Sequence, residues 1–185
     1  MKKRIAAILA ITVLLCASAR ADYMLGEAAE DAGNIGLAFE YWEKAAEQGD
    51  AQSAYTLGER YEEGAYGEKD AEKALEWYLK AAAQNHPKAQ YRIGVMYAKG
   101  LGMEQDDEKA VKWFLKSAEQ NDADAQYSLG VMCFEGRGTE QDDAKALEWY
   151  IKAAEQNHAA GQYGAGYMYR HGRGAQQDSI KAIEW

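Results

Sequence analysis

The fold of this chain is decided by residues 122–157, which read DADAQYSLGVMCFEGRGTEQDDAKALEWYIKAAEQN. The same pattern returns every 36 residues along the sequence. The residues that recur at this interval are Gly58, Gly94, Gly130 and Gly166; Tyr55, Tyr91, Tyr127 and Tyr163; Trp77, Trp113, Trp149 and Trp185; and Lys73, Lys109, Lys145 and Lys181. A period of this length is typical of helical repeat proteins, in which each copy is one small supersecondary unit.

Each copy predicts two helices joined by a glycine-containing turn, for example over residues 51–63 and 71–84. In the first helix, Ala54, Leu57 and Tyr61 recur at steps of three and four, which places them on one face. Three sets of residues mark the helix ends, and they also repeat: glycines after the first helix, aspartates before the second, and glycine or asparagine after it. They are Gly64, Gly100, Gly136 and Gly172; Asp70, Asp106, Asp142 and Asp178; and Gly49, Asn85, Asn121 and Asn157.

Glycine inside the first helix has a packing reason. Gly58 carries no side chain, so a partner helix can approach closely, and Trp77 with Tyr78 can fill the space between neighbouring pairs. One pair cannot bury this aromatic surface alone, so stability has to come from stacking adjacent copies. The predicted fold is therefore all-α, a right-handed α-α superhelix (solenoid) of helix-turn-helix repeats.

The repeat resembles that of the Sel-1-like repeat family, relatives of the tetratricopeptide repeats. The residues that carry the resemblance in the third copy are Leu129, Gly130, Gly136, Gly138, Asp142, Lys145, Ala146, Trp149, Tyr150, Lys152, Ala153 and Ala154. The resemblance covers most of the chain. It implies an adaptor that holds other proteins, and exported bacterial members are often linked to envelope processes or host contact.

The N-terminus predicts a secretory signal peptide over residues 1–21, because Lys2, Lys3 and Arg4 precede an apolar run and small residues follow it. We therefore expect an exported protein, periplasmic or secreted, with no membrane span. Lipidation at Cys16 is the less favoured alternative, because Leu15 stands where a lipobox wants a small residue.

The rest of the chain divides into a degenerate N-terminal capping half-repeat over residues 22–49, three repeats, and an incomplete fourth. The repeats span 50–85, 86–121, 122–157 and 158–185. The last second helix begins at Ile180 and stops at Trp185, so we expect a fragment, with a short complete protein as the alternative.

The net charge of the chain restricts the kinds of molecule that we expect it to bind. Removing residues 1–21 takes away four basic residues and no acid, so the formal net charge changes from −9 to −13. Phosphates would be repelled by such a surface, which argues against nucleic acid and anionic lipid as partners. Cys133 is the only cysteine outside the signal, so no internal disulfide can form. The other copies of the repeat have a tyrosine at the position of Cys133, and we therefore expect this cysteine to be buried in the core.

The candidate binding surface lies on the first helix of each repeat, at positions where the residue type differs from one copy of the repeat to the next. In helical-pair solenoids these helices line the concave face. The candidates are Arg92, Val95, Met96, Val131, Met132, Phe134, Tyr167 and Met168. An apolar stripe of this kind suits an amphipathic helix or extended peptide. The alternative is that the methionine column packs between successive first helices.

No residue set predicts catalysis. His86 and His158 share one column two copies apart, so they should not converge on a metal, and the paired aspartates fit helix starts. We expect no cofactor and no enzymatic activity, and a monomer that binds a protein or peptide. The rival function is a penicillin-binding or β-lactamase-like enzyme of the cysteine-rich branch of the family, which carries a cysteine pair in each repeat.

Overall fold

The computed structural model describes residues 2–65 and 67–185, and the side chains of residues 16–65 and 67–185. It contains ten helices and, within the described residues, no strand. They are α1 (Lys2–Asp31), α2 (Ile35–Glu47), α3 (Ala51–Glu63), α4 (Ala71–Ala82), α5 (Pro87–Lys99), α6 (Asp107–Ala118), α7 (Ala123–Glu135), α8 (Asp143–Glu155), α9 (Ala159–His171) and α10 (Ser179–Glu184). The all-α repeat architecture predicted from the sequence is confirmed.

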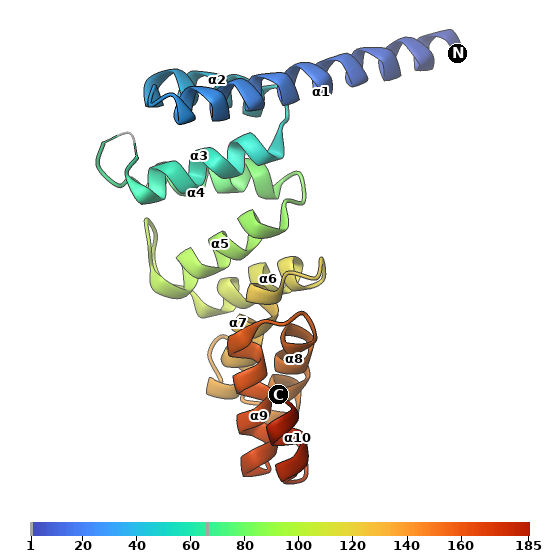
Figure 1. Ribbon diagram of the computed structural model, residues 1–185, viewed down its shortest axis with the longest axis vertical. Helices are drawn as coiled ribbons and strands as arrows, with labels where there is room; N and C mark the ends of the chain where they lie inside the picture. The colour runs from blue at the N-terminus through green and yellow to red at the C-terminus, as the bar shows by residue number, and fades with distance from the viewer. Residues whose placement is uncertain (1, 66) are drawn as a thin grey trace. The chain divides into compact units, whose positions relative to one another are not determined.

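The chain forms two compact units, Met1–Ala89 and Gln90–Trp185. In the first unit, α1 packs on α2, α2 on α3, and α3 on α4. In the second unit, α6 packs on α7, α7 on α8, α8 on α9, and α9 on α10 (Figure 1). Each odd-numbered helix is the first helix of a pair, and the even-numbered helix that follows is the second.

The predicted helix caps are present. The side chain of Asp70 accepts a hydrogen bond from the backbone N–H of Lys73 at 2.9 Å, which satisfies a donor that the first turn would leave unpaired. Asp106, Asp142 and Asp178 do the same for α6, α8 and α10. Gly136 ends α7 in the left-handed conformation, and Asn121 adopts a φ of 70° after α6.

One helix end differs from its prediction. We expected the second helix of the first repeat to reach Gln84, but α4 ends at Ala82. After Ala83 the backbone donors bond three residues back rather than four, with 3.0 Å from Gln84 N to Ala81 O and 3.0 Å from Asn85 N to Ala82 O. This tightening is the common way for a helix to use its last carbonyl groups.

In three of the pairs, an aromatic ring of the second helix lies against a glycine of the first. A Cβ built on Gly130 would lie 2.5 Å from Cδ1 of Tyr150, closer than any real carbon contact. The same relation joins Gly58 to Tyr78, and Gly94 to Phe114. Only glycine therefore allows the two helices of a pair to reach their observed separation.

In the first pair, α1 and α2, an aromatic ring also faces a glycine, but that glycine lies one helical turn away from the position that the repeat predicts. Trp42 lies 36 residues before Tyr78 and is fully buried. It faces Gly26, where the register of the repeat places Asp22, four residues earlier. Asp22 is buried and accepts hydrogen bonds from Lys44 Nζ and Gln48 Nε2, each at 2.9 Å. The region predicted as a degenerate half-repeat thus contains a packed helix pair.

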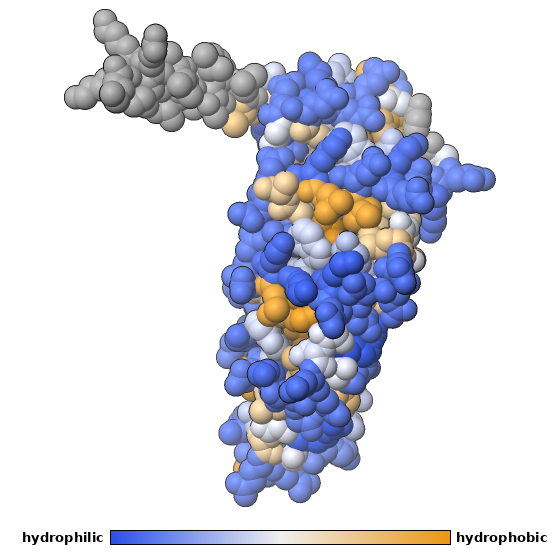
Figure 2. Space-filling view, turned by 180° about the vertical axis from the view of Figure 1, so that it is seen from behind, coloured by the Kyte–Doolittle hydropathy of each residue, from blue (hydrophilic) through white to orange (hydrophobic). Residues whose placement is uncertain are grey.

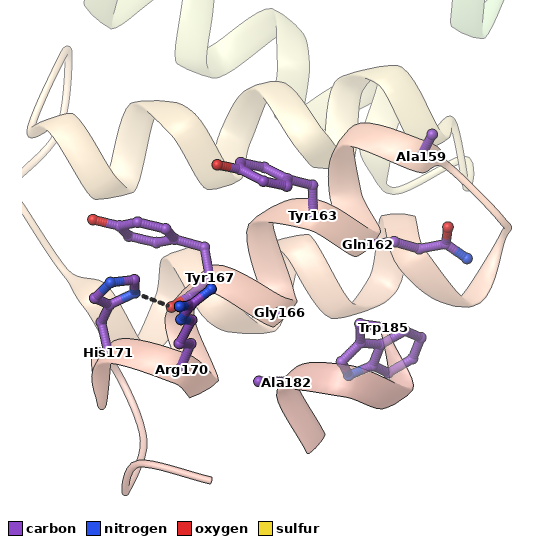
Figure 3. Close-up of a pocket in the computed structure, with 9 residues that line it drawn as sticks. All are labelled: Ala159, Gln162, Tyr163, Gly166, Tyr167, Arg170, His171, Ala182 and Trp185. Carbon is purple, nitrogen blue, oxygen red and sulfur yellow. Dashed lines mark hydrogen bonds between the residues drawn. The ribbon is translucent and has the colours of Figure 1, made fainter. Parts of the chain in front are cut away.

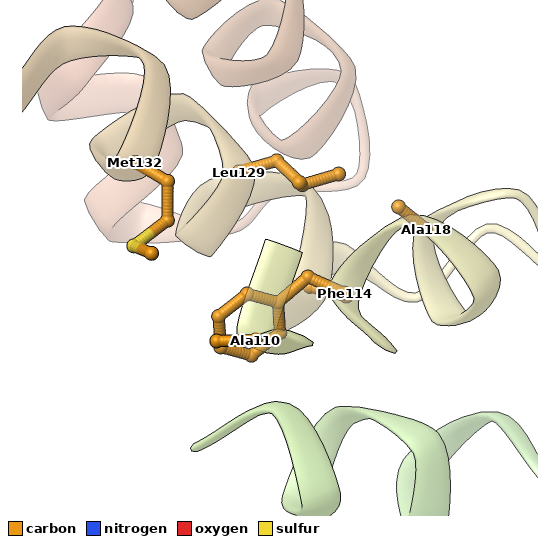
Figure 4. Close-up of a cluster of buried hydrophobic side chains, with 6 residues drawn as sticks. Ala110, Phe114, Ala118, Leu129 and Met132 are labelled. Atoms are coloured by element: carbon orange, nitrogen blue, oxygen red, sulfur yellow. The ribbon is translucent and has the colours of Figure 1, made fainter. Parts of the chain in front are cut away.

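The apolar core runs between the pairs as a series of clusters. One cluster in the second unit joins Phe114 of α6 to Leu129 and Met132 of α7, with alanines filling the gaps (Figure 4). The next cluster joins Leu147 and Tyr150 of α8 to Met168 of α9. Each second helix is therefore shared between its own first helix and that of the following pair, as repeat stacking requires.

Polar contacts repeat between consecutive pairs of the second unit. The guanidinium of Arg173 donates two hydrogen bonds to the Asp143 carboxylate, both at 2.8 Å, and Arg137 makes the same two-point contact with Asp107. Gly138 adopts a φ of 65°, and any Cβ there would collide with the backbone of Asp107. The contacts of Arg137 and Gly138 fix the turn between α7 and α8 against the start of α6, and that of Arg173 fixes the turn between α9 and α10 against the start of α8.

Histidines cap two of the first helices. His86 Nδ1 accepts a hydrogen bond from Ala89 N at 3.2 Å, and its ring stacks on Tyr55 with centroids 4.7 Å apart. His158 Nδ1 accepts from Gly161 N at 3.0 Å. This role, rather than a metal site, accounts for the shared column of the two histidines. Burial lowers the pKa of His86 below its ordinary value of 6.5, and the Lys88 charge adds to this effect.

We predict that replacing Gly130 with alanine lowers the free energy of unfolding by about 1–3 kcal/mol, the usual loss on overfilling a packed site. The matched control is Gly166→Ala, since there a Cβ would meet only Ala182 O at 3.1 Å and Trp185 Cβ at 3.8 Å. Urea denaturation measures both. A loss at Gly166 as large as that at Gly130 would contradict the ring contact.

We also predict that His86 makes the protein less stable in mild acid. Because its pKa is lower in the folded chain, the unfolded chain binds the proton more tightly, so this contribution to stability is complete above about pH 6.5 and is lost as the pH falls toward the folded pKa. His86→Asn keeps a capping oxygen without titrating. Between about pH 7.5 and pH 5.5, the urea midpoint of His86→Asn should fall less than that of the unaltered protein; equal falls would show that His86 contributes nothing.

Candidate functional site

The first helices of the second unit, α5, α7 and α9, carry all the predicted binding residues. Val95 on α5, together with Val131 and Phe134 on α7, is partly exposed, and Tyr167 on α9 is 38% exposed. Arg92 is half-buried on α5 and is not among the described residues that line the grooves below. Solvent can therefore reach this face at Val95, Val131, Phe134 and Tyr167.

The methionine column lies inside the protein. Met96, Met132 and Met168 are 1%, 3% and 0% exposed. Met132 belongs to the cluster with Phe114, and Met168 to the cluster with Tyr150. This burial favours the alternative that these side chains pack between successive helices, so we leave all three out of the proposed binding surface.

A first groove of about 280 Å³ lies between α5 and α7. Apolar side chains form most of its lining, with Phe114 and Met132 contributing from the core. The residues of the groove are Tyr91, Val95, Ala98, Lys99, Phe114, Tyr127, Ser128, Val131, Met132 and Arg137. Its two cationic side chains, Lys99 and Arg137, come from α5 and from the turn after α7.

A second groove of about 290 Å³ follows between α7 and α9. Its residues are Tyr127, Val131, Phe134, Glu135, Tyr150, Ala160, Tyr163, Gly164 and Tyr167. Phe134 and Tyr167 meet edge to face with ring centroids 6.2 Å apart, and Arg173 lies over the Phe134 ring at 4.0 Å. Tyr127 and Val131 line both grooves, so the two form one surface, which we call the paired groove.

The tyrosines of the paired groove were missed as binding residues. We read Tyr91, Tyr127 and Tyr163 as markers of the repeat, yet all three line the grooves, and Tyr163 is 76% exposed. The signal was present, because Tyr91 and Tyr127 each stand four residues before a candidate valine, which places them on the same helix face.

Burial keeps two of the phenols that line the paired groove, Tyr91 and Tyr150, neutral at physiological pH because it raises the pKa of each. Burial raises the pKa of Tyr91, and the negative charge of Asp124 raises it further. Burial also raises the pKa of Tyr150. Tyr91, which is partly exposed, therefore stays protonated, and its hydroxyl can donate a hydrogen bond to a peptide carbonyl or carboxylate while its ring offers apolar area.

Metal and thiol chemistry receive no support within the described residues. No group of three or more histidine, cysteine or acidic side chains there is placed to hold a metal ion. Cys133 is buried, as predicted, and burial raises the pKa of its thiol. In the part of the chain that the structure describes, none of the helices has the length and apolar character that crossing a bilayer requires.

The surface around the apolar patches is hydrophilic. On the face drawn in Figure 2, patches of apolar residues are separated by stretches of strongly hydrophilic ones.

The family is shown by comparison with known repeats. The Sel1 repeat model matches residues 19–50, 51–86, 87–122, 123–158 and 159–185, which is almost the whole chain. The chain belongs to the Sel1 repeat family. Sel1 repeat proteins generally mediate protein–protein interactions. No curated protein matches the chain.

Solved Sel1 structures share the fold. A Sel1 repeat protein from Oxalobacter formigenes is 31% identical with a TM-score of 0.83, covering 90% of this chain and 68% of that one. A protective antigen of uropathogenic Escherichia coli with an SLR fold is 38% identical with a TM-score of 0.85, again over 90% of this chain. This chain spans only 37% of the length of that antigen.

Cysteine rich protein B of Helicobacter pylori is also similar, at 27% identity and a TM-score of 0.51, over 68% of this chain and 94% of that one. The likeness does not extend to the cysteines. The present chain has two, Cys16 and Cys133, and both are free thiols.

Proposed function

We propose that this Sel1 repeat protein is an exported adaptor, and that its paired groove binds a peptide or protein segment. The observation that carries the proposal is the continuity of two apolar grooves across α5, α7 and α9, joined by Tyr127 and Val131. Tyrosine and other aromatic side chains dominate many protein interfaces because they combine large apolar area with a polar tip.

The two grooves are similar in size. Each holds about 280–290 Å³. Two adjacent hollows of this size suit consecutive apolar anchors of one amphipathic helix or extended segment. The exposed Lys99 would attract an acidic residue beside those anchors.

The remaining parts of the proposal rest on the sequence. The basic start and apolar run support export through a signal peptide over residues 1–21, although the side chains of residues 1–15 lie outside the described part. The net charge of −9 supports protein rather than nucleic acid as partner. We propose a monomer, with residues 22–49 as its N-terminal cap, and no enzymatic role or cofactor.

The test is a crosslinking pull-down from envelope extract with the variant Val95→Asn/Val131→Asn. Both valines line the grooves, so polar replacement should weaken capture of a specific partner at least about tenfold, as at interface hot spots. The matched control is Leu115→Asn/Ile151→Asn, two partly buried residues of α6 and α8 that line neither groove. Circular dichroism checks that both variants remain helical.

Capture that survives in the valine variant would contradict the proposal, and so would loss in both variants. The methionines are excluded from the design because their burial would turn a polar replacement into a folding defect.

A further inference from the structure

The residue that caps the first helix alternates between aspartate and histidine from one repeat to the next. The four capping residues, spaced by 36, are Asp50, His86, Asp122 and His158. The Asp50 carboxylate accepts a hydrogen bond from Ser53 N, and the Asp122 carboxylate accepts one from Ala125 N. Aspartate thus serves as the cap of a first helix in this chain. Capping alone therefore does not account for a histidine at position 158.

The ring of His158 makes two further contacts, both with α7. His158 Nε2 lies 3.1 Å from Asp124 Oδ1, and the His158 ring lies 5.3 Å from the Tyr127 ring, centroid to centroid. Asp124 and Tyr127 both belong to α7, the first helix of the preceding pair. His158 therefore joins the start of α9 to α7, at the tyrosine that the two grooves share.

The ring of Tyr127 has two aromatic neighbours of different kinds. Its centroid lies 5.7 Å from that of Tyr150 and 5.3 Å from that of His158. Tyr150 is buried and held against Gly130, whereas His158 is partly exposed and can take up a proton. His158 is thus the neighbour through which the position of Tyr127 can respond to conditions outside the protein.

The same histidine fixes the start of α9. The backbone N–H of Gly161 donates a hydrogen bond to His158 Nδ1 at 3.0 Å. Gly161 is buried, and a Cβ there would lie 2.7 Å from Ala153 Cβ and 3.0 Å from Ala154 N. Such crowding leaves little room for water to replace the histidine as acceptor, and a buried N–H without an acceptor is unfavourable.

The start of α9 matters because this helix forms one wall of the second groove. Four residues of α9 line that groove, namely Ala160, Tyr163, Gly164 and Tyr167. Figure 3 shows Ala159 near the start of α9 and the rings of Tyr163 and Tyr167 farther along it, pointing in the same direction. Since Ala160 follows His158 by two residues, the cap sets the place of this wall.

The hydrogen bonds determine which nitrogen of His158 carries the proton. A backbone N–H can only donate, so Nδ1 accepts from Gly161 and the ring proton is on Nε2, where it donates to Asp124. A second proton would occupy Nδ1 and end the cap. The ring would then be drawn toward the Asp124 carboxylate and away from the N–H of Gly161.

Few other charged groups face the ring. Asp124 and Tyr127 are its titratable contacts on α7. On α8 the nearest charged residue along the sequence is Glu155, which is exposed and forms no ion pair with His158 within the described residues. α9 itself contains no acidic residue, and its basic residues, Arg170 and His171, lie at the opposite end of the helix.

We propose that His158 is a positioning residue of the paired groove: the neutral ring holds Tyr127 and the start of α9 in place for binding, and protonation releases both. This inference rests on the proposed function of the groove. The groove therefore binds its partner most strongly when His158 is neutral, and loses affinity in mild acid as the ring takes up its proton.

The test follows the full chain by NMR, without a partner, between about pH 7.5 and pH 5.5. As the His158 ring signals titrate, the Gly161 amide should lose its protection from hydrogen exchange. The nuclear Overhauser contact between the rings of Tyr127 and Tyr150 should be lost with the same midpoint. This contact does not include the titrating ring, so it reports a movement of Tyr127.

The chain contains its own matched control. Tyr91 and Phe114 are the counterparts of Tyr127 and Tyr150, with ring centroids 5.8 Å apart, and the cap that corresponds to His158 is there Asp122. The contact between Tyr91 and Phe114 should stay constant over the same pH range. A contact between Tyr127 and Tyr150 that also stays constant while His158 titrates would overturn the proposal and leave His158 as a cap alone.

The variant His158→Asn separates capping from positioning. Asparagine keeps an oxygen for the N–H of Gly161 and does not titrate, but it has no ring to place beside Tyr127. The Gly161 amide should stay protected at both pH values, and the contact between Tyr127 and Tyr150 should be lost at both. An unchanged contact in this variant would contradict the proposal, and the titration of the unaltered chain decides the question even if the variant misfolds.

Binding is followed with the crosslinking pull-down described above, at the same two pH values. Capture by the unaltered chain should be lost at the lower pH, whereas capture by His158→Asn should be weak at both. Capture by the unaltered chain that does not change with pH would overturn the role of His158 in binding. Absence of specific capture even at the higher pH would instead overturn the proposed function, and the NMR results would still decide what His158 holds in place.

Discussion

A ring packed on a glycine sets the distance between the two helices of each pair. Tyr150 covers Gly130 so closely that even a methyl group would collide, and the same contact recurs at Gly58 and Gly94. Glycine in a helix costs about 1 kcal/mol relative to alanine. The structure accepts this cost three times in one register because the close approach buries a whole aromatic side chain.

The close pairing determines what the outer face of the first helices can offer. With Met96, Met132 and Met168 directed into the core, the side chains one position earlier, Val95 and Val131, face outward with the tyrosines four residues before them. The same packing that stabilises each repeat therefore leaves two joined apolar grooves on α5, α7 and α9. The same orientation of each first helix about its axis therefore places the methionines in the core and the valines on the proposed binding surface.

The sequence predicted the elements whose causes are local. Caps such as Asp142 and Asn121 act within one turn of chain, so their spacing was sufficient to place the helix ends. The packing of α1 was not foreseen, because Gly26 lies one turn out of the register of the repeat. The burial of Met132 was also undecided, since helical spacing identifies a face but not whether the neighbouring pair covers it.

The most direct test of the ring contact is the proton NMR shift of the glycine Hα atoms. A ring stacked on a glycine moves the signals of its Hα atoms strongly upfield, and a glycine without a facing ring shows no such shift. We expect upfield Hα signals for Gly58, Gly94 and Gly130 and ordinary ones for Gly166, since only the first three face a ring. Ordinary shifts at all four glycines would contradict the account.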